Sequence, residues 1–139
     1  MNLDLIVVDT NVFISAILST NGTAYQALSK ALKHFTIVHS SETYQELTQR
    51  IYKPKFDTYI SNQRREEFLG SIRQKSQFSP TTIVITDCRD PEDNKFLELA
   101  LEVEAKFLLT GDKDLLSLKT QSQYQNLVIS PRDFLNLDW

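Results

Sequence analysis

Two aspartates of this 139-residue chain stand where a carboxylate could hold a metal ion. Asp9 directly follows the apolar run Ile6-Val7-Val8, and Asp112 comes just after Leu108-Leu109-Thr110-Gly111. Such runs are typical of strands in a parallel sheet, and ligands of these sheets lie beyond the carboxyl ends of the strands. Either residue alone is explained equally well as an Asp that caps the next helix. On neighbouring strands, however, the two charges would repel each other without a cation, so the pair indicates a metal site.

Asp93 is predicted to join them as a third ligand. It shares a helical face with the apolar residues three, four, seven and eight positions later, so its carboxylate is expected to point inward. Asp90 is interpreted as the N-cap of the same helix, with Pro91 at its first position. An inward carboxylate needs a partner, and the sequence offers no fixed cation for Asp93.

Periodicity alone gives Glu46 a different interpretation. The helix expected after Ser40 or Ser41 has an apolar stripe through Tyr44 and Leu47, and Glu46 falls on the other side. This pattern favours a surface residue that pairs with Arg50 four positions later.

A cluster of oxygen donors suits a hard cation, Mg²⁺ or Mn²⁺, better than zinc. The two histidines, His34 and His39, flank a predicted strand without metal-ligand spacing and are interpreted as structural or surface residues. Mg²⁺ in such sites takes part of its coordination shell from substrate phosphates. The cluster therefore predicts phosphate chemistry, in which the metal lowers the pKa of an attacking water and stabilises the leaving oxygen.

The elements expected to position these residues alternate between short strands and helices. Strands are expected at 5–8, 35–38, 82–85, 107–110 and 127–129. Helices are expected at 11–18, 23–34, 41–53, 61–77, 90–105 and 114–118, with a last turn from Pro131. Parallel strands joined by helices predict an α/β/α sandwich, with a sheet of about five strands flanked by helices. The length, without repeats or linkers, predicts a single domain over residues 1–139.

Charge is unevenly distributed along the chain. The net charge of −3 excludes a uniformly basic nucleic-acid-binding module. Residues 28–78, however, carry nine basic against five acidic side chains, and they contain the only candidate face for a nucleic-acid backbone. A solvated helix is the alternative interpretation. The candidate face comprises Arg50, Lys53, Lys55, Arg64, Arg65, Arg73 and Lys75, with Tyr52, Phe56 and Tyr59 available to stack on bases.

Cysteine content and the N-terminus indicate the compartment. Cys88 is the only cysteine, so no internal disulfide can form, and a reducing cytoplasm is expected. The apolar stretch 5–8 is far too short for a signal peptide or a membrane span, so we expect no association with a membrane.

Four stretches in this order resemble the PIN-domain family, and in particular its bacterial branch of VapC-like ribonucleases, the toxins of toxin-antitoxin systems. They are Val8-Asp9-Thr10-Asn11-Val12-Phe13, Glu46-Leu47, the run from Arg89 to Ala100 and the run from Leu109 to Leu116. The similarity extends from about Leu5 to Leu135, and the order and spacing of the stretches make it specific.

The resemblance implies a function and a set of site residues. It implies endonucleolytic hydrolysis of RNA with Mg²⁺ or Mn²⁺, an antitoxin that inhibits the enzyme, and a homodimer. It implies an acidic catalytic quartet of Asp9, Glu46, Asp93 and Asp112. Asp9, Asp93, Asp112 and Asp114 are the implied metal ligands, Asn11 and Thr110 support them, and Arg50, Lys53 and Lys55 are candidates for substrate binding.

Three other classes of protein remain as alternatives. Asp9 with the late Gly111-Asp112-Lys113-Asp114 also resembles haloacid-dehalogenase-like phosphatases, but these usually have a second acid where Asn11 stands and a longer chain. A receiver domain needs an acidic pair after the first strand and a late-strand lysine, and neither is in place. A catalytically silent PIN scaffold that only binds partners is the third.

Overall fold

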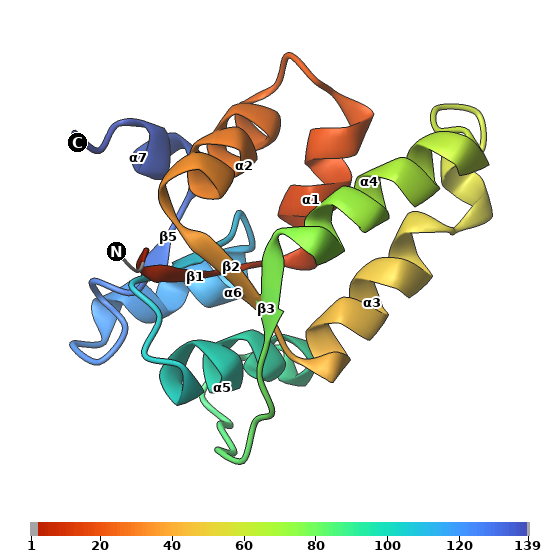
Figure 1. Ribbon diagram of the computed structural model, residues 1–139. Helices are drawn as coiled ribbons and strands as arrows, with labels where there is room; N and C mark the ends of the chain where they lie inside the picture. The colour runs from red at the N-terminus through yellow and green to blue at the C-terminus, as the bar shows by residue number, and fades with distance from the viewer. Residues whose placement is uncertain (1–2, 139) are drawn as a thin grey trace.

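Five parallel strands form the central sheet of the computed structural model, which describes residues 3–138 (Figure 1). The strands are β1 (Leu5–Val8), β2 (Thr36–His39), β3 (Ser76–Phe78), β4 (Phe107–Leu109) and β5 (Val128–Ile129). Their order is β3-β2-β1-β4-β5, so the chain runs outward from β1 first in one direction and then in the other. In sheets of this kind the reversal, here between β1 and β4, opens a crevice at the carboxyl ends of the strands.

Helices cover both faces of this sheet, as the α/β/α prediction requires (Figure 1). Short 3₁₀ turns, η1 (Pro54–Phe56), η2 (Pro91–Asp93) and η3 (Ser117–Thr120), lie between them. The α-helices are α1 (Thr10–Leu18), α2 (Thr23–His34), α3 (Ser41–Ile51), α4 (Asn62–Gln74), α5 (Asn94–Glu102), α6 (Lys113–Leu116) and α7 (Pro131–Leu135).

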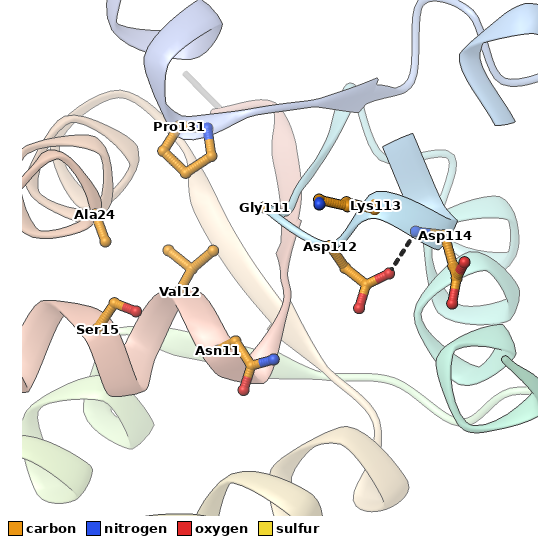
Figure 2. A pocket seen from close by; sticks show the side chains of 9 residues that line it. All are labelled: Asn11, Val12, Ser15, Ala24, Gly111, Asp112, Lys113, Asp114 and Pro131. Carbon is orange, nitrogen blue, oxygen red and sulfur yellow. Dashed lines mark hydrogen bonds between the residues drawn. The ribbon is translucent and has the colours of Figure 1, made fainter. Parts of the chain in front are cut away.

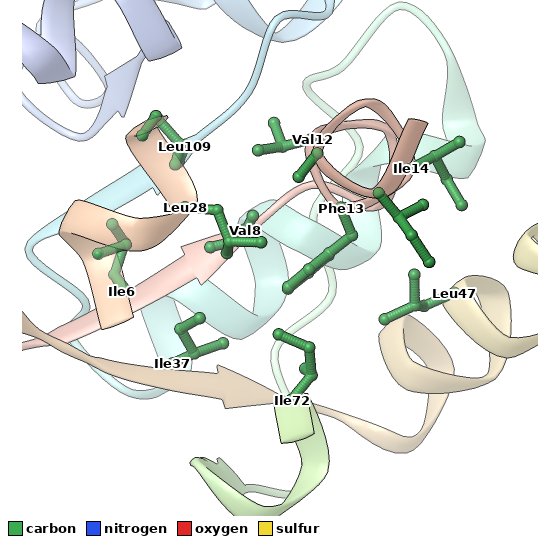
Figure 3. Packing of buried hydrophobic residues seen from close by; sticks show 14 of the residues in the cluster. Ile6, Val8, Val12, Phe13, Ile14, Leu28, Ile37, Leu47, Ile72 and Leu109 are labelled. Carbon is green, nitrogen blue, oxygen red and sulfur yellow. The ribbon is translucent and has the colours of Figure 1, made fainter. Parts of the chain in front are cut away.

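An apolar core lies on each side of the sheet because successive strand residues point to opposite faces. Ile6 and Val8 of β1 pack with α1 and α2 on one side (Figure 3), whereas Val7 packs with α5 and α6 on the other. Both faces are thus buried, which explains why β1 is a continuous apolar run. No helix within residues 3–138 is long and apolar enough to cross a membrane.

The predicted strand at 82–85 is wrong, because the third strand is Ser76–Phe78 and the following segment crosses α5 without joining the sheet. Its backbone amides are instead bound by α5 side chains. The N–H of Thr82 donates to Glu102 Oε1 at 2.7 Å, and the N–H of Ile85 donates to Glu98 Oε2 at 3.0 Å. Hydrogen bonds from the N–H of Thr82, followed by those from its hydroxyl and from the N–H of Ile83, lower the pKa of Glu102. Because Glu98 and Glu102 share one face of the helix, they satisfy donors that a strand would place in a ladder.

The helix predicted over 90–105 begins later and ends earlier. Residues 91–93 form the η2 turn, and α5 covers only Asn94–Glu102. Glu104 has a φ of 52°, the left-handed conformation that closes many helices, and the N–H of Ala105 bonds back to the Ala100 carbonyl at 2.9 Å. This end lacks the glycine that usually marks a left-handed residue after a helix, because Glu104 occupies that position.

Arg65 is a buried structural residue and not part of a basic surface, which corrects the prediction for this position. Its side chain is 2% exposed. Its Nε donates to the Ile51 carbonyl at the end of α3 at 2.7 Å, and its Nη1 lies 3.0 Å from Asp57 Oδ1. The guanidinium also lies over the Tyr52 ring, 5.5 Å from its centroid. Arg65 therefore closes the C-terminus of α3.

His39, at the end of β2, is a buried structural residue. Its ring stacks on Phe13 at 5.5 Å between centroids and contacts Phe78 and Tyr44 at 5.7 and 5.3 Å. Burial lowers the pKa of His39 to about 4. The folded protein therefore holds this imidazole neutral in a pH range where the unfolded chain protonates it.

The first prediction concerns acid stability. Because the folded pKa of His39 lies below the unfolded value of 6.5, its stabilising contribution is complete above pH 6.5 and is lost as the pH falls towards 4. The loss should reach about 2–3 kcal/mol. Urea unfolding at several pH values should show that His39→Gln, which cannot titrate, loses less stability than the wild type in this window. Equal losses in the two proteins would contradict the assignment.

Candidate metal centre

Asp9 and Asp112 follow the neighbouring strands β1 and β4, so both stand at the crevice where the strand order reverses. The Asp9 N–H continues the pairing of the strands by donating to the Leu109 carbonyl at 2.9 Å. Thr110 joins the two acids: its Oγ1 donates to Asp9 Oδ2 at 2.7 Å and accepts from the Asp112 N–H at 3.0 Å. The Thr110 hydroxyl therefore links the segments that follow β1 and β4 and sets the distance between Asp9 and Asp112.

Asp9 and Asp112 also cap helices, so each can be a helix cap and a candidate metal ligand at the same time. Asp9 Oδ1 accepts from the N–H of Asn11 at 3.3 Å, and Asp112 Oδ1 accepts from the N–H of Asp114 at 2.8 Å (Figure 2). An ionised carboxylate offers about four lone-pair sites, so capping leaves capacity for a cation. Asp9 is nearly inaccessible, and its burial raises its pKa, as do the charges of Asp112 and Glu46, against the effect of the Thr110 hydrogen bond.

Asp93 lies on the inner side of the η2 turn, where periodicity placed it. Only 8% of its surface is exposed, and its Oδ2 is buried with no hydrogen-bond partner among the described residues. Burial raises the pKa of Asp93 to about 7, and the nearby charges of Asp112, Asp9 and Asp90 add to the effect. A buried oxygen without a partner is costly, and a bound cation would remove that cost. The residues present therefore fit a divalent metal ion.

Asp90 is the acid that the sequence interpretation missed. It is the expected cap, since its Oδ1 accepts from the Glu92 N–H at 3.0 Å. It also lies with Asp93 and Asp114 in a group whose ligand oxygens are all within 4.8 Å of one another. The three-residue spacing of Asp90 and Asp93, which puts two acids on one turn, was the available signal.

Glu46 pairs with Arg50, as periodicity predicts, and also lies near the acidic centre. Its Oε1 lies 2.9 Å from both Arg50 Nη2 and Lys95 Nζ, and its Oε2 accepts from the Thr10 hydroxyl. The predicted pair with Arg50 is thus present. The predicted surface position is wrong, because α1 and α5 cover the side chain and leave 10% of it exposed. The charge of Glu46 contributes to raising the pKa of Asp9 and Asp93, so it stands close to both.

Hollows that adjoin Asn11 lie on either side of this residue, beside the acidic centre. One, of about 480 Å³, lies between α1 and the loop Gly111–Asp114 (Figure 2). The other, of about 150 Å³, is lined by Arg50, Lys53, Lys55 and Asn11. Arg50 also donates to Asn11 Oδ1 at 3.4 Å, which links this basic hollow to the metal centre.

The remaining members of the predicted basic face are dispersed. Arg64 lines a groove with Glu67 and Phe68, and Lys75 lines another beside α2. The structure therefore brings Arg50, Lys53 and Lys55 to the acidic centre and does not bring Arg64 or Lys75 there.

Residues 5–114 match the family model of the PIN domain, and the chain therefore belongs to the PIN-domain family. The uncharacterized protein MJ1680 of Methanocaldococcus jannaschii is 31% identical over 143 aligned positions, covering 94% of this chain and 88% of that protein.

Two solved structures share the fold at low identity. PAE2754 from Pyrobaculum aerophilum has a TM-score of 0.61 and 13% identity, with 96% of this chain and 88% of that chain covered. The structure of VapBC2 from Rickettsia felis bound to a DNA fragment from its promoter has a chain with a TM-score of 0.58 and 14% identity, with 91% and 98% covered.

Proposed function

We propose that this PIN-domain protein is an endoribonuclease that depends on Mg²⁺ or Mn²⁺ and hydrolyses phosphodiester bonds of RNA. The observation that carries the proposal is the buried Oδ2 of Asp93, which has no hydrogen-bond partner within residues 3–138 and lies near the carboxylates of Asp9, Asp112 and Glu46. Family membership favours a nuclease over the phosphatase alternative. The neutral Asn11, where a phosphatase would have its second acid, agrees with this choice.

Asp9, Asp93, Asp112 and Asp114 would hold the metal. When bound, the ion would lower the pKa of the attacking water and stabilise the negative charge on the leaving ribose oxygen. Thr110 orients Asp9 and Asp112 through its two hydrogen bonds. Glu46 already pairs with Arg50 and Lys95 and accepts from the Thr10 hydroxyl. It would therefore hold the Arg50 and Lys95 side chains beside the scissile phosphate, in addition to any contact with the attacking water.

The substrate would lie across the basic hollow of Arg50, Lys53 and Lys55. If cations neutralise the four carboxylates of Asp9, Glu46, Asp93 and Asp112, the rest of the chain has a net charge of +1. The acidic composition then does not oppose a polyanion. Phe56 lines this hollow, and Tyr52, which precedes Lys53 in the chain, is 41% exposed; both are available to stack on an unpaired base.

The second prediction tests this hollow by substrate binding. In an inactive Asp9→Asn background, the double variant Lys53→Ala/Lys55→Ala should bind single-stranded RNA roughly tenfold more weakly. The slope of log affinity against log salt should fall by about 1.4, because two phosphate contacts are lost. Lys106→Ala is the matched control, since Lys106 precedes β4 at the opposite end of the sheet and should leave both quantities unchanged. An unchanged salt slope in the double variant would place the RNA elsewhere.

We further propose that the nuclease is the toxin of a toxin-antitoxin pair, held inactive by an antitoxin protein, and that it acts in the cytoplasm as a homodimer. The similarity to the fold of a chain in the VapBC2 structure supports this role. Induced expression should arrest growth, and co-expression of a small open reading frame immediately upstream should relieve the arrest. Growth that continues despite cleavage activity in vitro would leave a nuclease without a toxin role.

The chemistry of the products tests the proposed reaction. A panel of end-labelled RNA and single-stranded DNA should show cleavage of RNA, with 5′-phosphate and 3′-hydroxyl ends. Products with 2′,3′-cyclic phosphates would instead indicate attack by the ribose and contradict hydrolysis by a metal-activated water. Absence of cleavage with either metal would favour the silent PIN scaffold.

A further inference from the structure

We propose that the hollow of about 480 Å³ between α1 and the loop Gly111–Asp114 binds one unpaired nucleotide of the RNA, on the side of Asn11 away from the basic hollow. Lys113 binds a phosphate of this nucleotide, and Ser15 lies against its base. The inference rests on the proposed function for the identity of the substrate as RNA. It adds a second place where the protein holds the strand beside the metal.

The hollow lies directly beside the acidic centre. Asp112 and Asp114, two of the proposed metal ligands, form part of its wall. Asn11 lines both this hollow and the basic one, so the two are adjacent. An RNA strand whose scissile phosphate lies at the metal therefore reaches the basic hollow with one neighbouring nucleotide and this hollow with the other.

Lys113 supplies a positive charge that the fold leaves without a partner. It is exposed and stands between Asp112 and Asp114 in the sequence, yet within residues 3–138 it forms no ion pair or hydrogen bond through its side chain. Its ammonium end is turned away from Asp114 (Figure 2). Lys119 differs, because two backbone carbonyls hold its Nζ at 3.0 and 2.6 Å. Once a metal neutralises the neighbouring carboxylates, Lys113 suits a phosphate.

The walls of the hollow combine apolar surface with hydrogen-bonding groups, as sites for planar ligands do. Val12, Ala24 and Pro131 supply the apolar surface. Ser15 and Asn11, one turn apart on α1, are both exposed and supply a hydroxyl and an amide (Figure 2). Within the described residues the Ser15 hydroxyl forms no hydrogen bond. The volume lies within the range of about 300–1,000 Å³ that is typical of ligand pockets, so one nucleotide fits.

RNA binding by the inactive Asp9→Asn protein tests the role of Lys113. Adding Lys113→Ala should weaken binding of a single-stranded RNA about fivefold, and the slope of log affinity against log salt should fall by about 0.7, because one phosphate contact is lost. The melting temperature should not change, since Lys113 has no partner to lose. Lys106→Ala is again the matched control, at the opposite end of the sheet.

A series of RNAs with one abasic nucleotide, moved along the strand position by position, tests the role of Ser15. Ser15→Leu, which fills the hollow, should weaken binding of intact RNA roughly tenfold in the same inactive protein. At one abasic position it should have no further effect, because the base that it displaces is already missing. Ser29→Leu makes the same change in the hollow between α2 and α4 and should bind every RNA as the parent does.

Two results would overturn the inference. One is a Lys113→Ala variant with unchanged affinity and salt slope, and the other is a Ser15→Leu effect that is the same at every abasic position. Either result, if wild-type RNA cleavage with Mn²⁺ persists, would leave the proposed function standing. Absence of cleavage by the wild type, together with the expected binding results, would contradict the proposed function and not the nucleotide site.

Discussion

Asp9→Asn is expected to lower metal-dependent RNA cleavage by a factor of about a thousand or more, because it removes a ligand charge on which several kcal/mol of transition-state stabilisation depend. The substitution is small. Asparagine Oδ1 can still accept from the Asn11 N–H, and its Nδ2 can donate to the Thr110 hydroxyl, whose other lone pair accepts from the Asp112 N–H, so the cap of α1 and the link between Thr110 and both positions should be retained. Initial rates on a fluorogenic RNA, measured with melting curves, separate loss of chemistry from loss of fold.

Asp4→Asn is the matched control for this variant. It makes the same change of charge immediately before β1, at the opposite end of the strand that Asp9 follows, where its carboxylate is exposed and lies 3.6 Å from Lys106. We expect wild-type rates for this control. Cleavage by Asp9→Asn at more than about a tenth of the wild-type rate would contradict the assignment of Asp9 as a metal ligand.

Asp93→Asn should abolish cleavage and, in EDTA at pH 8, stabilise the protein by about 2 kcal/mol. The pKa of Asp93 is raised from 3.8 to about 7 by burial and by the neighbouring acids. The folded protein therefore binds a proton more readily than the unfolded chain, so this residue stabilises the fold more as the pH falls from 7 towards 4. At pH 8 the carboxylate is ionised and unfavourable, and the neutral amide removes that cost.

Urea unfolding at pH 8 and pH 5 measures this effect. The advantage of Asp93→Asn should shrink at pH 5, where the wild-type carboxylic acid is protonated in the folded state. Saturating Mn²⁺ at pH 8 should reverse the order, since it stabilises the wild type by binding the folded state only. A variant less stable than the wild type at pH 8 in EDTA would mean that Asp93 already has a favourable partner in the metal-free protein.

Features set by local periodicity were predictable from the sequence. The parallel sheet with helices on both faces follows from short apolar runs between helices, and the positions of Asp9 and Asp112 beyond strand ends follow from apolar runs that end in acids. That their strands, β1 and β4, are neighbours is a finding of the structure. The inward direction of Asp93 follows from its place on the apolar face of a helix.

Features set by contacts between distant segments were not predictable in this way. Thr82–Ile85 has the composition of a strand, yet acceptors on α5 bind its amides. Arg65 has the charge typical of a surface residue, yet its side chain is buried because it donates to the Ile51 carbonyl at the end of α3. Glu46 lies on the polar side of α3, but Thr10 of α1 and Lys95 of α5 contact its carboxylate and bury it.

Cleavage of one defined RNA by metal-free protein, titrated with Mn²⁺, tests the central claim most directly. We expect no cleavage in EDTA, cleavage that saturates with added Mn²⁺, and none by Asp9→Asn prepared in the same way. Cleavage in EDTA, or equal cleavage by wild type and Asp9→Asn at saturating Mn²⁺, would contradict an acidic metal centre built on Asp9, Asp93 and Asp112.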